Sequence, residues 1–149
     1  MNDEMQDIIV EFLAETNESL NELDHDLLSL EQNPDDEALI SNIFRVLHTI
    51  KGTCGFLGLP RLEKIAHKGE DVMGLVRDGD LVMKAQYATV IFEAFDEIKK
   101  IVVTLEDTGL EPEGDDTQLL KKLEDIYNRK DLANEANAET DDDNQDEDF

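Results

Sequence analysis

Apolar residues recur at alternating steps of three and four along the first thirty positions of the chain. This spacing is typical of an amphipathic helix that packs one face into a bundle. The stripe consists of Met5, Ile9, Phe12, Thr16, Leu20, Leu23, Leu27 and Leu30. Asn33-Pro34 ends the segment, and the acidic run at 35–37 suits the positive N-terminal end of a following helix.

Four more segments repeat this pattern. A helix from about residue 35 is expected to bury Ile40, Ile43, Leu47, Ile50, Cys54 and Leu57, and to end at Gly58. The next opens at Pro60, buries Leu62, Ile65, Ala66, Val72, Met73 and Val76, and ends at Asp78-Gly79-Asp80. The fourth runs from about Lys84 to Thr108 with Tyr87, Ile91, Ala94, Ile98, Ile101 and Leu105 inside. A shorter fifth helix starts near Asp116 or Thr117 and carries Leu119, Leu120, Leu123, Ile126 and Tyr127.

Short connections between long amphipathic helices predict an all-α protein, an antiparallel up-down four-helix bundle with an additional C-terminal fifth helix. We expect this bundle to span residues 1–130 as one domain. Residues 131–149 hold nine acids, no base and almost nothing apolar, which predicts a disordered acidic tail or linker.

The formal net charge of −25 is unevenly distributed. Residues 1–44 hold 13 acids and no lysine or arginine, whereas residues 45–77 hold six bases against three acids. An acidic chain does not bind nucleic acid through bulk charge. The basic window could attract phosphate or an acidic pocket, or it could simply offset the acidic first helix.

Composition excludes several other classes. The single Cys54 rules out an internal disulfide and a cysteine-based zinc site. The sequence contains no run of 18 apolar residues that could form a membrane span. Its acidic start does not resemble a signal peptide. A calcium-binding EF-hand loop is also missing. We therefore expect a cytoplasmic protein without membrane insertion.

The candidate chemistry lies within the basic window, around His48. This histidine is turned about 100° from the buried stripe, with Lys51 and Gly52 one turn later. An exposed imidazole is a nucleophile at neutral pH, and a carboxylate bound to one ring nitrogen leaves the lone pair of the other exposed. Glu70, on the next helix beside His67, is the best candidate for that carboxylate.

Each residue also has a plainer interpretation. Lys51 could be an ordinary solvated lysine, and His67 with Glu70 an ordinary surface pair. Two histidines and a carboxylate could instead bind zinc through His48, His67 and Glu70, although Lys51 would oppose a cation. A third alternative is a non-catalytic helical scaffold, in which replacing His48 changes nothing.

His48-Thr-Ile-Lys51-Gly52, followed by Gly55, Gly58 and the segment Ala66-His67-Lys68-Gly69-Glu70, resembles the histidine-phosphotransfer (HPt) domain of CheA-type chemotaxis kinases. The resemblance covers about residues 3–130, including the fifth helix. It implies that His48 accepts a phosphoryl group from an ATP-binding kinase domain and donates it to an aspartate of a CheY-like response regulator. It further implies that Glu70 orients His48 and that Lys51 and His67 neutralise phosphoryl oxygens. Thr53-Cys54 departs from the small pair expected after Gly52.

The same resemblance makes the chain a phosphoacceptor without its own kinase activity. No glycine-rich phosphate loop is present in the sequence, so ATP and Mg²⁺ are expected to belong to the partner domains. The regulator is expected to dock where glycines keep the helix surface low beside His48. The predicted docking residues are Phe44, Arg45, Gly52, Gly55, Leu57 and Gly74.

Overall fold

The computed structural model describes residues 3–129, and five helices make up most of this range. They are α1 (Asp3–Gln32), α2 (Glu37–Leu57), α3 (Pro60–Arg77), α4 (Ala85–Thr108) and α5 (Thr117–Tyr127). No strand occurs within residues 3–129. The all-α prediction is therefore confirmed, with helix ends close to those expected from the sequence.

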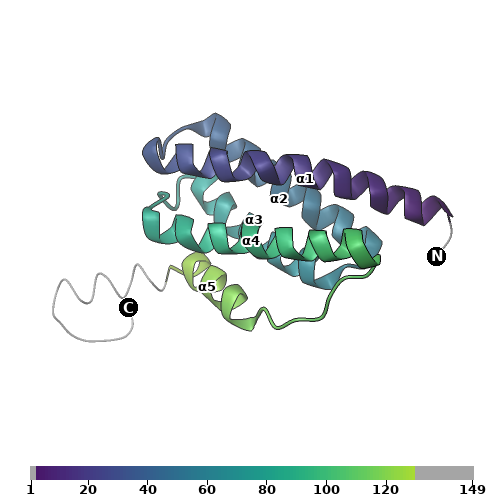
Figure 1. The fold of residues 1–149 in the computed structure, drawn as a ribbon. Coiled ribbons are helices and arrows are strands. Elements are labelled where there is room, and N and C mark those ends of the chain that lie inside the picture. The colour runs from purple at the N-terminus through teal and green to yellow at the C-terminus, as the bar shows by residue number, and fades with distance from the viewer. Residues whose placement is uncertain (1–2, 130–149) are drawn as a thin grey trace.

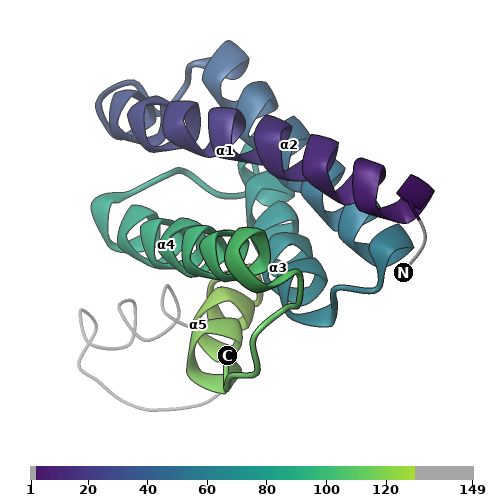
Figure 2. The same cartoon turned by 45° about the vertical axis from the view of Figure 1, so that its right-hand side comes forward.

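The first four helices run in alternating directions around a shared core (Figure 1). α1 contacts α2 and α4, and α3 contacts the same two helices, which closes the four-helix bundle. α5 packs outside this bundle, against α3 and α4 (Figure 2). The predicted up-down bundle with a fifth helix is thus confirmed, while the predicted acidic tail at 131–149 lies outside the described residues.

The core contains most of the predicted apolar stripe. Leu23, Leu47 and Ile98 are fully buried, and Thr16 is a buried polar member of the stripe on α1. Met5, Leu57, Leu119 and Leu120 are only partly buried, each packed against the edge of the core. Tyr127 ends α5 as one of the apolar residues expected on that helix; it is 43% exposed, whereas the neighbouring Ile126 is buried in the core.

Local signals account for both ends of α2 and for the start of α3. Asp36 caps α2 by accepting a hydrogen bond from the backbone N–H of Leu39 at 3.2 Å. Gly58 ends the helix in a left-handed conformation with φ of +75°, which glycine adopts without steric cost. Pro60 then takes the first position of α3, where its missing N–H is no loss.

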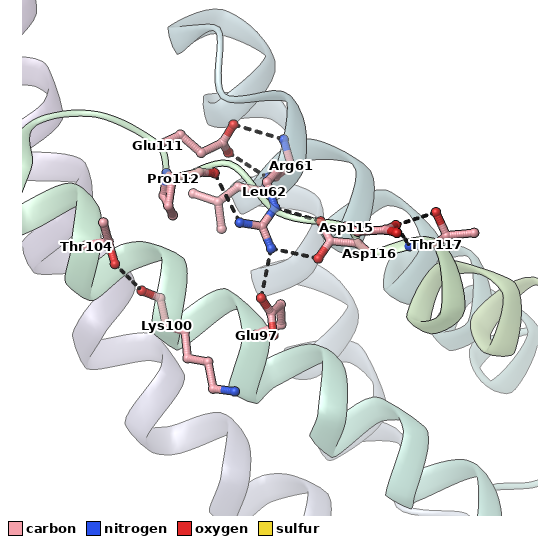
Figure 3. A network of polar contacts seen from close by, with 10 residues as sticks. All are labelled: Arg61, Leu62, Glu97, Lys100, Thr104, Glu111, Pro112, Asp115, Asp116 and Thr117. Atoms are coloured by element: carbon pink, nitrogen blue, oxygen red, sulfur yellow. Dashed lines mark hydrogen bonds and ion pairs between the residues drawn. The ribbon is translucent and has the colours of Figure 1, made fainter.

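The N-terminus of α3 has no cap from its own sequence neighbour, and a distant carboxylate supplies it instead. Glu111, in the loop before α5, accepts hydrogen bonds from the backbone N–H groups of Arg61 at 3.1 Å and Leu62 at 2.9 Å (Figure 3). A negative side chain at this end of a helix is also favoured by the helix dipole. The loop between α4 and α5 is thereby attached to the start of α3.

The side chain of Arg61 connects three further parts of the fold (Figure 3). Its guanidinium donates two hydrogen bonds to the Asp116 carboxylate, at 2.8 and 2.7 Å, and one to Glu97 on α4 at 2.8 Å. A fourth reaches the carbonyl of Pro112 at 3.1 Å. Hydrogen bonding to Asp116, partly opposed by burial, raises the pKa of Arg61 above its already high ordinary value, so the charge is permanent.

No helix of the described range 3–129 has the length and apolar character needed to cross a bilayer.

Candidate functional site

The position of His48 follows from the phase of α2. Leu47 and Ile50 are buried in the core, so His48 between them points to the flank of the helix. Its side chain is 60% exposed. The imidazole is therefore accessible to another macromolecule.

Close packing of α3 against α2 brings a carboxylate to this flank. Gly69 is buried, and a Cβ atom at this position would lie 3.3 Å from Cδ1 of Leu47, closer than most real contacts of that kind. Glycine thus allows the α3 backbone to approach α2 near His48. The next residue, Glu70, faces His48 with only 9% of its side chain exposed.

Glu70 contacts two functional groups at once. Its Oε2 lies within hydrogen-bonding distance of Nδ1 of His48, and its Oε1 lies 2.8 Å from Nζ of Lys51. Burial by itself would raise the pKa of the Glu70 carboxyl, but the hydrogen bonds from Lys51 and His48 outweigh burial and hold this pKa below its usual range. The carboxylate is therefore ionised at neutral pH and can only accept.

The ionised carboxylate decides the tautomer of the imidazole. A hydrogen bond between Glu70 and Nδ1 requires Nδ1 to carry the proton. In the neutral ring, Nε2 then holds the free lone pair. This is the nitrogen available to form a new bond.

Lys51 on α2 and His67 on α3 both lie near Glu70. Lys51 is held by the carboxylate, with 28% of its side chain exposed. Nε2 of His67 lies 3.7 Å from Oδ1 of Asp71, one turn along α3, and the side chain of His67 is 55% exposed. Lys51 is therefore linked to His48 through Glu70, whereas His67 pairs with Asp71 and lines the same pocket as Lys51 and Glu70.

A metal site composed of His48, His67 and Glu70 was one alternative from the sequence. Among the described residues, the group whose ligating atoms lie within 4.8 Å of one another is His67, Glu70 and Asp71, without His48. Lys51 already places a cation at 2.8 Å from Glu70. The geometry gives the zinc hypothesis no further support.

The predicted docking residues differ in their surroundings. Gly52 is exposed, and a Cβ atom there would have no neighbour within 4 Å. A Cβ atom at Gly55 would lie 3.2 Å from the Glu63 carboxylate, and one at Gly74 would lie 3.6 Å from the ring of Phe44. Gly52 is thus the glycine whose missing side chain leaves open space above α2.

The other three docking candidates also lie on α2. Phe44 is partly buried one turn before it. Arg45 is exposed and lines a pocket of about 460 Å³ between α1 and α2, together with Phe12 and Thr16 among others. Leu57 is partly buried against the core at the end of the helix.

Two residues near His48 were not singled out by the sequence. Arg77 lies over the ring of Phe44, with 4.2 Å between its guanidinium carbon and the ring centroid. Tyr127, at the end of α5, shares a pocket of about 310 Å³ with Phe44, Lys51, His67, Glu70 and Arg77, among other residues. Both come from segments far from His48 in sequence, so helical spacing does not reveal them.

Comparison with known proteins assigns the fold and its site to a family. The model of the Hpt domain matches residues 7–129. The chain belongs to the Hpt domain family. The family expected from the motif around His48 is thereby confirmed.

Curated relatives of this Hpt domain include chemotaxis kinases. It is 41% identical over 107 residues to the sensor histidine kinase CheAY of Helicobacter pylori, covering 72% of this chain and 13% of that protein. It is 34% identical over 98 residues to the chemotaxis protein CheA of Bacillus subtilis, covering 66% of this chain and 15% of that protein. The chain thus spans a small part of the length of these relatives.

Solved structures of similar fold are phosphotransfer domains. The phosphorylated P1 domain of CheA3, in complex with CheY6 from R. sphaeroides, matches with a TM-score of 0.75 and 27% identity, covering 83% of this chain and 97% of that one. The CheA phosphotransferase domain from Thermotoga maritima matches with a TM-score of 0.64 and 34% identity, covering 70% and 98%.

Proposed function

We propose that this Hpt domain is the phosphotransfer domain of a chemotaxis kinase. In this role His48 accepts a phosphoryl group from an ATP-binding, CheA-type kinase domain and donates it to an aspartate of a CheY-like response regulator. The observation that carries the proposal is the pairing of Nδ1 of His48 with the ionised Glu70, because it leaves the lone pair of an exposed Nε2 free. The proposal is supported by the similarity to a sensor histidine kinase CheAY and a chemotaxis protein CheA, and by a similar solved domain that is a phosphorylated P1 domain in complex with CheY6.

The transfer has two steps. In the first, Nε2 attacks the γ-phosphorus of ATP, and an N–P bond forms as the bond to the bridging oxygen breaks and ADP leaves. The ring becomes positively charged, and the Glu70 carboxylate at Nδ1 stabilises that charge as an aspartate does beside a catalytic histidine. In the second, a carboxylate oxygen of the regulator attacks the phosphorus and the N–P bond breaks, which returns the lone pair to Nε2.

The residues around His48 suit the charge that moves in these steps. Phosphoryl transfer depends on positioning and on stabilising the oxygens of the transferred group. Lys51 and His67 are the cationic groups that we assign to those oxygens. ATP, Mg²⁺ and the acidic pocket of the regulator would come from partner domains, so the chain is a carrier that depends on partners. An ATP-dependent donor places this chemistry in the cytoplasm, where we expect the domain to act.

Docking of the regulator would use the open face beside His48. The aspartate must reach bonding distance of the phosphorus, which requires a low surface next to the imidazole. Gly52, one turn after His48 and without a neighbour at its Cβ position, provides this clearance. Phe44, Arg45, Gly55, Leu57 and Gly74 complete the proposed docking surface.

Incubation with a CheA-type kinase core and γ-labelled ATP tests the assignment. We expect acid-labile label on the wild-type domain and none on His48→Gln, with unchanged helical content by circular dichroism. His25→Gln is the matched control, because His25 is an exposed histidine on α1 and should leave labelling intact. Full labelling of His48→Gln, or label mapped to His25 or His67, contradicts the proposal.

A further inference from the structure

The imidazole of His48 is part of a three-residue stack that links α2 and α3. The ring of Phe44, one turn earlier on α2, lies nearly parallel to the imidazole, with an interplanar angle of 11° and 6.1 Å between centroids. The guanidinium of Arg77, from the last turn of α3, lies over the same phenyl ring at 4.2 Å from its centroid. Phe44 is thus in contact with the phosphoaccepting residue and with a cation from the neighbouring helix.

The phenyl ring lies beside the α3 backbone at Gly74. A Cβ atom at Gly74 would lie 3.6 Å from Cε1 of Phe44, an ordinary van der Waals distance, so the ring packs close to α3 without requiring a glycine there. Arg77 follows three positions later on the same helix face and covers the ring. The ring is therefore held between the backbone of α3 and a cation–π contact.

A second contact on His48 is needed because one hydrogen bond does not fix a ring. The bond from Nδ1 to Glu70 fixes one atom of the imidazole, while the ring can still rotate about that contact. A parallel aromatic ring restricts this rotation and thus the direction in which the lone pair of Nε2 points. Direction matters, since small misplacements of reacting atoms lower transfer rates strongly.

We propose that Phe44, held in place by Arg77 and by the neighbouring α3 backbone, is a positioning residue that fixes the plane of the His48 imidazole for phosphoryl transfer. The inference rests on the proposed function of His48 and adds Phe44 and Arg77 to the residues that orient the imidazole. It also gives Phe44 a role that differs from contact with a docked regulator. A docking residue acts on the affinity of the partner, whereas a positioning residue acts on the rate within the complex.

The test distinguishes the effect of the aromatic ring of Phe44 from the effect of its apolar volume. Phe44→Leu keeps an apolar side chain but removes the ring, whereas Phe44→Tyr keeps the ring and should restore wild-type behaviour. We expect Phe44→Leu to lower the kcat for phosphorylation of His48 about two- to tenfold, the range that an aromatic pair is worth, with little change in KM. Arg77→Gln should lower it about two- to fivefold, as expected for an exposed cation–π contact. Lys100→Gln, which removes an exposed cation from α4 far from the proposed docking surface, is the matched control.

A spectroscopic measurement reads the stack without any partner. Side-chain order parameters and residual dipolar couplings of the His48 ring, measured by NMR on the unphosphorylated domain, should show a mobile ring in Phe44→Leu and a fixed ring in Phe44→Tyr. Arg77 is a surface residue, so Arg77→Gln keeps the test valid where Phe44→Leu does not fold. An ordered ring with unchanged kcat in both Phe44→Leu and Arg77→Gln overturns the inference, as does an effect on KM alone. A wild-type domain without label instead overturns the proposed function, while the NMR measurement still decides whether the stack orders the ring.

Discussion

Replacing Arg61 by alanine tests the contacts that attach α5 to the bundle. The guanidinium is 15% exposed and the carboxylate of Asp116 is 9% exposed, so the substitution leaves a buried carboxylate without its partner. Removal of one member of a buried ion pair typically costs about 3–5 kcal/mol. Glu97, with 29% of its side chain exposed, can recover water, so most of the loss comes from Asp116.

We expect Arg61→Ala to lower the free energy of unfolding by about 3–5 kcal/mol in urea, measured by circular dichroism. For a domain of this size, this corresponds to a fall in melting temperature of roughly 10–20 °C. Hydrogen exchange should increase first in α5, because Asp116 precedes its first residue. The cap from Glu111 uses the backbone N–H groups of α3 and should persist.

Two controls make the Arg61 prediction specific. Lys121→Ala removes an exposed pair with Asp125 on α5 and should cost less than about 1 kcal/mol. Gly114→Ala should destabilise the wild type, since its Cβ atom would lie 2.6 Å from the guanidinium carbon of Arg61. In the Arg61→Ala background the same change should be nearly neutral. A loss below 1 kcal/mol for Arg61→Ala, or an equal cost of Gly114→Ala in both backgrounds, would refute the reasoning.

Four further predictions concern the site and the core. Glu70→Ala should slow phosphorylation of His48 by about 10²-fold or less while the bundle stays folded, measured by single-turnover labelling. Because the pKa of Glu70 is lowered in the folded state, the ionised carboxylate stabilises the fold at neutral pH, and this contribution is lost as the pH falls through that pKa. In urea titrations, the difference in free energy of unfolding between wild type and Glu70→Gln should therefore shrink from pH 7 to pH 3. Gly52→Ala should stabilise α2 by about 1 kcal/mol. Gly52→Arg should leave the domain folded and block phosphoryl transfer to the regulator in a stopped-flow assay. Transfer at the wild-type rate in Gly52→Arg would show that the regulator docks elsewhere. Burial, followed by the charges of Glu111 and Glu63, raises the pKa of the Cys54 thiol to about 12. Alkylation of Cys54 at pH 8 should therefore require unfolding, and rapid alkylation of the native domain would contradict this prediction.

The helices were predictable because each carries its own periodic signal and stop residues. The stripes on α1 to α4, Pro60 at the start of α3 and Gly58 after α2 are all local features of the sequence. Tyr127, 43% exposed beside the buried Ile126, shows that apolar character alone does not indicate burial in the last turn of α5. At the end of a short helix, a shift of one position moves a side chain from the core to the surface.

The contacts around Arg61 could not be predicted, since their partners are about fifty residues away. Glu111 and Asp116 belong to a loop and a helix start, where no periodicity indicates which residue they meet. From the sequence, Arg61 was only one of several bases in a positive window. The neighbours of His48 differ in whether the sequence could predict them, for the same reason. Lys51 and Gly52 follow from helical spacing, whereas the approach of Arg77 depends on how α3 packs.

The glycines show that one residue type serves two different purposes on this surface. A Cβ atom at Gly69 would meet the side chain of Leu47, and one at Gly74 would meet that of Phe44, so both glycines lie inside the contact between α2 and α3. In this contact His48 meets Glu70 and the phenyl ring of Phe44. A Cβ atom at Gly52 would have no neighbour within 4 Å, and this open surface is where the proposed regulator must approach. Orientation of the imidazole therefore depends on Glu70 and Phe44, whereas clearance for the partner depends on Gly52. It follows that changes at Glu70 and Phe44 should alter rates within a complex, whereas changes at Gly52 should alter whether the complex forms.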